Sequence, residues 1–127
     1  MRQALRSLYA DGEAVAALAT FGEAATEIEV ANKLLLQRAD RLRHAAEEPY
    51  SAMDAIVHRR DIAFAVQKAR RAVNRLMELS SGSGIYAAGR IEQLWRDCNA
   101  SAAHASFGWE AAMTTYGRAL LEDPTAC

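Results

Sequence analysis

Apolar residues recur at intervals of three and four along most of the chain, and no stretch keeps the strict alternation of a half-buried strand. This pattern predicts an all-α protein. The periodic segments are residues 20–47, 51–79, 86–105 and 109–121. Two long helices and two shorter ones are expected to form an antiparallel four-helix bundle.

The first segment predicts an amphipathic helix. Its apolar stripe consists of Phe21, Ile28, Leu35, Ala39, Leu42 and Ala46, and its opposite face carries Glu23, Glu27, Lys33, Gln37 and Arg41. Thr20 is a candidate N-cap, because Glu23 three residues later would complete a capping box. Residues 13–19 are also compatible with a helix, and an internal glycine costs only about 1 kcal/mol, so an earlier start that includes Gly22 stays open.

The second segment begins after Pro49, which ends the first helix because proline disfavours the α-conformation of the residue before it. Ser51 and Asp54 provide a second candidate cap. The apolar stripe of this helix consists of Ile62, Val66, Ala69, Val73 and Leu76. Two long helices joined by a tight turn are expected to pack antiparallel.

A glycine- and serine-rich stretch, SSGSG at residues 80–84, predicts a flexible turn between this hairpin and the rest of the chain. The third helix would carry Ile91, Leu94, Trp95, Cys98 and Ala102 on its apolar stripe. Gly108 marks the break before the fourth helix.

Composition narrows the class of protein. The 127 residues, 51% of them hydrophobic, suit a single helical domain spanning residues 1–127, and no apolar run approaches the roughly 18 residues of a membrane span. A net charge of −1 gives no general attraction to nucleic acid or to an anionic membrane. The amino-terminal stretch lacks a secretory signal, which predicts a cytoplasmic protein. Two cysteines, and no Glu-x-x-His spacing, predict neither a disulfide framework nor a metal site.

The stretch RDCNASAAH, residues 96–104, holds the candidate chemistry. His104 follows Asp97 by seven residues, which on a helix places both on one face with Ser101 between them. A histidine beside small residues and a carboxylate can act as a general base near neutral pH. The alternative is a histidine that only hydrogen-bonds in a helix interface. Arg96 and Asp97 are interpreted as a structural ion pair.

The SSGSG stretch has two interpretations as well. Its backbone N–H groups could approach a phosphate or a planar ligand, or the segment could simply turn the chain. It lacks the lysine and the preceding strand of a phosphate-binding loop, which argues against a nucleoside triphosphatase.

Taken together, these motifs resemble the carboxy-terminal helical domain of the acyl-CoA dehydrogenase superfamily. The features that carry the resemblance are the small-residue turn at Ser80 to Gly84, the LWRD tract, the histidine seven residues after its aspartate, and the YGRALL ending. Within the superfamily, the chain is most similar to the oxygenase components of two-component, reduced-flavin-dependent aromatic monooxygenases.

The resemblance implies a function. In that family a separate reductase delivers reduced flavin, FMN or FAD, and a flavin hydroperoxide hydroxylates a phenolic substrate. It implies that His104 is the catalytic base, that Ser81, Gly82, Ser83 and Gly84 approach the flavin, and that Trp109 and Tyr116 line the substrate pocket. It also implies self-association into a dimer or tetramer.

The family's amino-terminal helical domain and middle β-domain are absent from this sequence, so the chain alone is expected to be inactive and not to bind flavin tightly. The favoured interpretation is that the chain is the C-terminal helical domain, or a fragment, of such a monooxygenase. Two alternatives stay open. One is a stand-alone, non-catalytic helical module for oligomerisation or binding. The other, weaker one is a piece of a true acyl-CoA dehydrogenase, for which no residue matches the catalytic glutamate of many members.

Overall fold

Helices account for all the regular structure in the described part of the chain. The computed structural model describes residues 12–83, 88–104 and 108–123. These form α2 (Gly12–Arg43), the short 3-10 helix η1 (His44–Ala46), α3 (Ala52–Ser83), α4 (Ala88–Ala102) and α5 (Trp109–Glu122). The prediction of an all-α protein with two long and two shorter helices is confirmed. Within these residues, no helix is long and apolar enough to cross a membrane.

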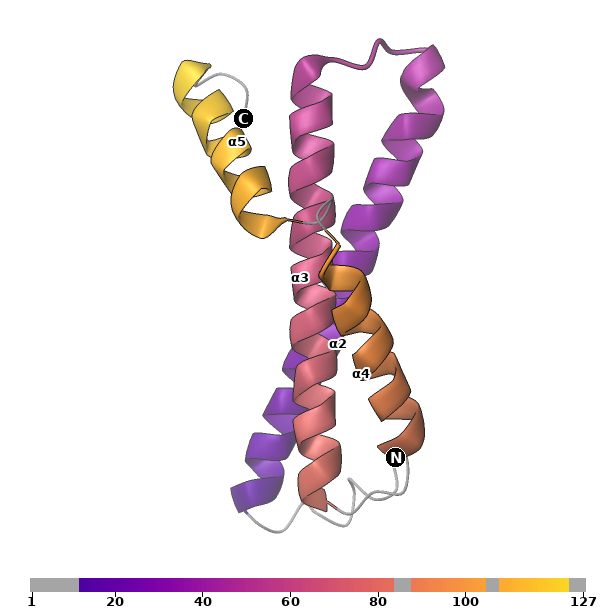
Figure 1. Cartoon of the computed structure of the whole chain (residues 1–127), viewed down its shortest axis with the longest axis vertical. Coiled ribbons are helices and arrows are strands. Elements are labelled where there is room, and N and C mark those ends of the chain that lie inside the picture. Colours follow the sequence, from indigo (N-terminus) through magenta and orange to yellow (C-terminus); the bar gives the residue numbers. More distant parts are fainter. Residues whose placement is uncertain (1–11, 84–87, 105–107, 124–127) are drawn as a thin grey trace.

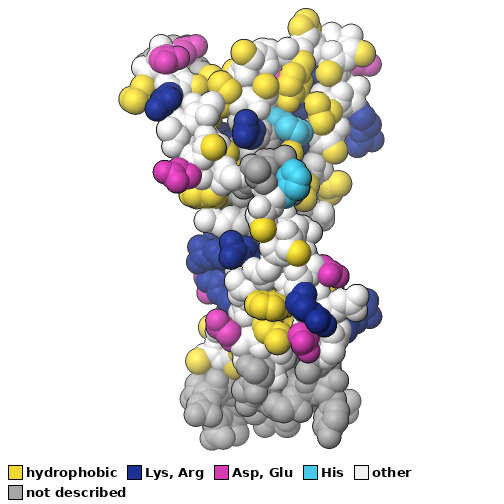
Figure 2. Space-filling model, in the orientation of Figure 1, with side chains coloured by type: hydrophobic (Ala, Val, Ile, Leu, Met, Phe, Trp, Pro, Cys, Tyr) yellow, Lys and Arg dark blue, Asp and Glu magenta, His cyan; other side chains and the backbone are white. Residues whose placement is uncertain are grey.

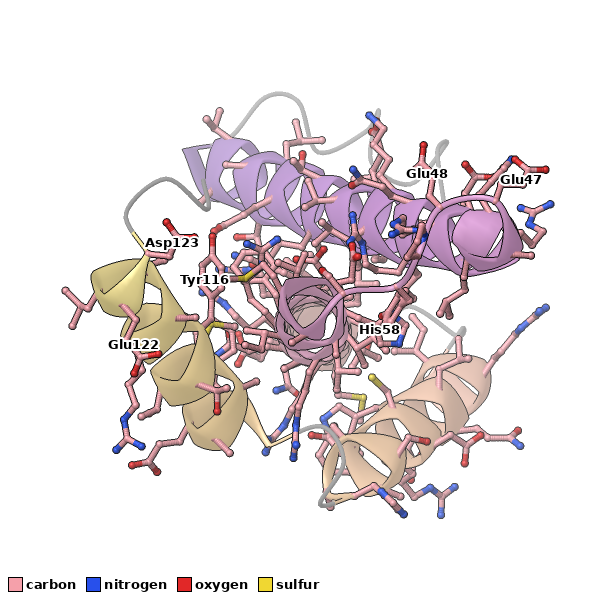
Figure 3. All side chains as sticks on the ribbon, turned by 90° about the horizontal axis from the view of Figure 1, so that it is seen from above. Glu47, Glu48, His58, Tyr116, Glu122 and Asp123 are labelled. Atoms are coloured by element: carbon pink, nitrogen blue, oxygen red, sulfur yellow. The ribbon has the colours of Figure 1, made fainter. Side chains whose placement is uncertain are left out.

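Helix α3 is the centre of the arrangement. It runs antiparallel to α2, and the two long helices cross at an angle (Figure 1). Helix α4 packs along the C-terminal half of α3 and α5 along its N-terminal half, on different sides (Figures 1 and 3). In the described residues each of these three helices packs mainly on α3. The predicted antiparallel four-helix bundle, in which every helix would pack against two neighbours, is not confirmed.

The start of α3 follows the predicted cap. The hydroxyl of Ser51 accepts a hydrogen bond from the backbone N–H of Asp54 at 3.0 Å, and an Asp54 carboxylate oxygen accepts one from the backbone N–H of Ser51 at 2.9 Å. Arg41 on α2 donates to the same carboxylate at 2.8 Å and to the carbonyl oxygen of Pro49 at 3.1 Å. Together, the Ser51 N–H, Arg41 and the Ser51 hydroxyl lower the pKa of Asp54 to about 2. The turn between the long helices is therefore held by Arg41 from α2 and by the Ser51–Asp54 cap of α3.

The start of α2 differs from the prediction. The helix begins at Gly12, and Thr20 lies inside it, donating its hydroxyl to the carbonyl oxygen of Ala16 at 3.0 Å. The Thr20–Glu23 capping box is therefore wrong. A threonine in a continuing helix satisfies its hydroxyl on the preceding turn, and the open alternative of an earlier start with Gly22 inside the helix is the one the structure shows.

The face of α2 that packs on α3 is not the apolar stripe. Ala24, Glu27 and Ala31 are buried against α3, whereas Ile28, Leu35 and Leu42 on the stripe are 47%, 44% and 48% exposed. Pairing between charged residues of the two helices selects the first face. The apolar stripe and the face that packs on α3 lie next to each other on the surface of α2. The hydrophobic pattern alone therefore identifies the wrong one of two neighbouring faces.

Ion pairs run along the interface between α2 and α3. Glu27 is paired with Arg75, with Lys68 at 3.4 Å and with Arg71 at 3.3 Å. Burial raises the pKa of Glu27, but these cations outweigh it and the net shift is downward. Nearer the turn, Arg38 Nε lies 3.0 Å from Asp61 Oδ2, in ion-pair contact without hydrogen-bond geometry. Charged pairs therefore contribute specific contacts along the length of the hairpin.

The hydrophobic core is made of small side chains. In the described residues the buried apolar side chains are all alanines, and no large side chain is fully buried: Ala24, Ala31, Ala63, Ala65, Ala72, Ala112 and Ala119. Alanine allows close helix approach but removes little apolar area from water. Larger apolar residues reach the surface instead, over the ends of α2 and α3 that meet at the turn and over α5 (Figure 2).

Mutation tests which of the two candidate N-caps, Ser51 or Thr20, begins a helix. We expect Ser51→Ala to lower the free energy of unfolding by about 1 kcal/mol, because it removes a working N-cap. The matched change Thr20→Ala should alter it by less than about 0.5 kcal/mol, because Thr20 lies inside a helix. Urea unfolding followed by circular dichroism measures both, and equal effects would contradict the assignment of the helix starts.

Candidate functional site

His104 lies just outside the helix on which it was predicted. Helix α4 ends at Ala102, and His104 follows in a bend, exposed to solvent. Its backbone N–H donates to the carbonyl oxygen of Ser101 at 3.1 Å. The argument that Asp97 and His104 share a helix face through a seven-residue spacing is therefore wrong, because the helical path does not continue to residue 104.

The last turn of α4 shows why the helix stops. The backbone N–H of Ala103 is shared between the carbonyl oxygens of Asn99 at 3.2 Å and Ala100 at 3.3 Å, and the next N–H bonds three residues back. This tightening from α to 3-10 geometry is common at helix ends. The α-helix therefore ends before His104.

A small hollow lies between α3, the end of α4 and the start of α5. Its volume is about 170 Å³, and its lining combines apolar and polar side chains: Ala63, Val66, Gln67, Arg70, Ala102, Gly108 and Trp109. Ala102 and Gly108 flank the connection that contains His104. His104 follows Ala102 by two residues, but the ring is not part of the lining.

A polar network beside the hollow fixes α4 on α3. Trp95 Nε1 donates to Asn74 Oδ1 at 2.7 Å, and Asn99 Nδ2 donates to the same oxygen at 3.3 Å. Arg70 Nε donates to Asn99 Oδ1 at 2.9 Å. None of these polar residues was predicted as part of a site. The signal that could have identified the network is a pair of asparagines, Asn74 and Asn99, on two helices expected to be neighbours.

Trp109 and Tyr116 dock α5 on α3. The ring of Trp109 lies 5.8 Å from that of Phe64, centroid to centroid, and the guanidinium carbon of Arg60 lies 4.3 Å from the ring centroid of Tyr116. Tyr116 points from α5 towards α3 (Figure 3). Trp109 lines the hollow and Tyr116 does not. Of the two residues predicted for a substrate pocket, the structure brings one to the concave surface.

The predicted turn at residues 80–84 is helical as far as it is described. Helix α3 continues to Ser83, and the Ser80 hydroxyl donates to the carbonyl oxygen of Met77 at 2.9 Å. The turn prediction is therefore wrong for Ser81, Gly82 and Ser83, and Gly84 lies outside the described residues. Serine satisfies its hydroxyl on the preceding turn, and the low helix propensity of glycine, about 1 kcal/mol, does not stop a long helix near its end.

The ion pair predicted between Arg96 and Asp97 is formed with a different carboxylate. Arg96 lies 3.9 Å from Glu92, one turn earlier on α4, and both side chains are exposed. Neighbouring residues on a helix point about 100° apart, whereas residues four apart lie side by side. Such an exposed pair contributes little to stability. In the described part of the chain, no group of three His, Cys, Asp or Glu side chains gathers as metal ligands.

The hollow beside the end of α4 is too small to enclose a flavin. Ligand pockets have volumes of about 300–1,000 Å³, and the hollow beside the His104 segment, about 170 Å³, is smaller. The residues expected to approach the flavin either continue α3 or lie outside the described residues. A flavin and an aromatic substrate would need walls from further polypeptide, to which this surface could contribute one side.

Comparison with known proteins gives two matches. The family model described as "Acyl-CoA dehydrogenase, C-terminal domain" matches residues 2–109. The oxygenase component of an FADH2-dependent resorcinol hydroxylase from Rhizobium sp. (strain MTP-10005) is 33% identical over 105 residues, which are 78% of this chain and 26% of that protein. The chain thus spans about a quarter of the length of this relative. No solved structure matches the chain significantly.

The polar network predicts a local effect of mutation. Asn99→Ala removes a hydrogen-bond acceptor from Arg70 and a donor to Asn74, so we expect the free energy of unfolding to fall by about 1–2 kcal/mol. Amide hydrogen exchange in α4 should accelerate more than in α2. Ser101→Ala, an exposed change on the same helix, is the control. Uniform acceleration in both helices would contradict the anchoring role.

Proposed function

The chain belongs to the family of acyl-CoA dehydrogenase C-terminal domains, and we propose that it is the C-terminal helical domain of a reduced-flavin-dependent monooxygenase that hydroxylates a phenolic substrate. The observation that carries this proposal is the 33% identity to the resorcinol hydroxylase oxygenase component. A flavin reductase acting in trans would supply the reduced flavin, and the domain would also hold subunits together.

In this proposal His104 is the residue of the chain that acts in the chemistry. A phenolate is a better carbon nucleophile than a phenol, so a base near the substrate hydroxyl favours hydroxylation. The imidazole is suited to this task at neutral pH. His104 is exposed and lies two residues after Ala102, which lines the hollow, so a substrate held by other parts of the polypeptide could reach this end of α4.

A second candidate function is supported by the composition of the core. A helical module without redox chemistry, acting in oligomerisation or binding, would account for an interior of alanines and for large apolar side chains left at the surface. It differs from the first proposal in giving His104 no chemical task.

A chimeric enzyme tests the function. Residues 2–109 of this chain would replace the matching segment of the resorcinol hydroxylase oxygenase component, and hydroxylated product would be measured with resorcinol, oxygen and a flavin reductase. We expect the chimera to retain activity. A chimera that folds and binds reduced flavin but forms no product would contradict the monooxygenase assignment and favour the non-catalytic module.

The role of His104 has its own test in the same chimera. His104→Ala should lower product formation by about a hundredfold, the lower end of general-base contributions, while flavin binding is retained. His44→Ala, which changes an exposed histidine of η1, is the control and should leave product formation unchanged. Equal activity of the two variants would remove His104 from the mechanism.

A further inference from the structure

A second hollow lies between the N-terminal half of α3 and α5. Its volume is about 180 Å³, and its lining residues are Ala55, Ile56, Arg59, Ala112 and Thr115. These side chains are mainly apolar, and the guanidinium of Arg59 is the one charged group among them. The hollow shares no lining residue with the one at the end of α4. The two are therefore separate surfaces of the domain.

An open depression on α5 adjoins this hollow. Its lining residues are Gly108, Trp109, Glu110, Ala111, Thr114, Thr115 and Arg118. The hollow and the depression meet at Thr115, which lines both. Basic side chains are visible over α5 and over the N-terminal half of α3, with uncharged atoms between them (Figure 2). Arg59 of α3 and Arg118 of α5 thus line two surfaces that join.

Arg59 and Arg118 differ from the cations that lie between the helices. Those cations have carboxylate partners: Arg38, Arg41, Arg60, Lys68, Arg71 and Arg75. Neither Arg59 nor Arg118 has a hydrogen bond, ion pair or ring contact with any residue in the described part of the chain. Glu110 lies eight residues before Arg118, about 12 Å along the helix. Both guanidinium groups are therefore available to an anion from solution.

The size and chemistry of the hollow select the kind of anion. An apolar protein cavity of about 150 Å³ binds benzene, and the hollow, at about 180 Å³, is slightly larger. A guanidinium binds a carboxylate through two parallel hydrogen bonds. The Thr115 hydroxyl already donates to the carbonyl oxygen of Ala111 at 2.8 Å, so the donors for a ligand come from arginine.

We propose that this hollow binds a small aromatic carboxylic acid. The ring lies against Ala55, Ile56 and Ala112, the carboxylate accepts hydrogen bonds from Arg59, and the charge of Arg118 adds to the attraction. The site is distinct from the surface near His104, so it goes beyond the proposed function and does not depend on it.

Occupation of the site would also hold α5 on α3. The hollow is lined by three residues of α3 and two of α5, so a bound acid contacts both helices. Without it, α5 is anchored through the rings of Trp109 and Tyr116. A ligand that binds only the docked arrangement favours that arrangement by mass action. Amide hydrogen exchange in α5 should therefore slow when the acid is added.

The first test is a titration of the chain with benzoate, followed by nuclear magnetic resonance of its backbone amides. We expect a dissociation constant of about 1 mM or lower, as suits a ligand of few atoms, with the largest shifts at Ile56, Arg59 and Thr115. Benzamide lacks the charge and acetate lacks the ring, so each should bind at least about tenfold more weakly. Absence of saturable binding, shifts centred elsewhere, or equal binding of benzamide would overturn the proposal.

The second test changes the charge. Arg59→Gln should raise the dissociation constant of benzoate about tenfold, because it removes the cation that holds the carboxylate. Arg90→Gln is the matched control, since Arg90 is also exposed but lies near the start of α4, at the far end of α3 from α5 (Figure 1). It should change the constant by less than about twofold. Equal effects of the two changes would show that Arg59 does not hold the ligand.

The third test fills the hollow. Ala55 is exposed, so Ala55→Leu adds volume at the edge of the hollow without disturbing a buried position. It should weaken benzoate binding at least about tenfold, because the added side chain occupies the space of the ring. Ala100→Leu, at an exposed position of α4, is the control and should leave binding unchanged. Retained binding in a folded Ala55→Leu variant would place the ligand outside the hollow and overturn the proposal.

Discussion

The structure depends on ion pairing across an interface that is otherwise lined by alanine. Between α2 and α3 the buried apolar residues are small and alike, so hydrophobic contact alone distinguishes poorly between one register of the hairpin and the next. The charged residues select one register of the hairpin. Near the turn, Arg41 and Arg38 of α2 face Asp54 and Asp61 of α3, and farther from the turn the signs are reversed, with Glu27 of α2 facing cations of α3. A slip by one turn would leave buried charges without their partners, which is costly.

This register places the remaining elements. With α3 fixed, its other sides receive α4 through the asparagine network and α5 through Phe64 and Arg60. Ala102 and Gly108 then border the hollow near the middle of α3, and His104 follows Ala102 by two residues. The described part of the domain thus presents several concave surfaces and several uncovered apolar side chains. That is the expected form of a unit whose ligand site is completed by further polypeptide.

The sequence predicted the kind and number of helices, because spacing by threes and fours over long segments is a strong signal. It also predicted the start of α3, where Ser51 follows a proline that stops the preceding helix. The same serine- or threonine-based signal misplaced the start of α2 at Thr20, because nothing before Thr20 ends a helix. A capping residue is informative only where the chain has a reason to break.

The predicted site was less accurate, and the causes are local. Hydrophobicity selected Ile28, Leu35 and Leu42 as the packing face, but pairing of buried charges, which a hydrophobic pattern does not record, selected Glu27 and its neighbours. The predicted helix ran to residue 105, but α4 ends at Ala102, two residues before His104, which is enough to remove the face shared with Asp97. The glycine-serine stretch was predicted as a turn from its composition. That prediction did not allow for a long helix continuing through a few residues of low helix propensity, as α3 does to Ser83.

The most direct measurement of the central claim is a double-mutant cycle between Glu27 and Arg75. The free energy of unfolding would be determined in urea for the chain, for Glu27→Gln, for Arg75→Gln and for the double variant. If the pair fixes the hairpin, the coupling energy should be about 1–3 kcal/mol, within the range found for residues in one ion-pair network. A coupling energy of zero within error would show that the buried charges do not hold α2 on α3, and would contradict the account.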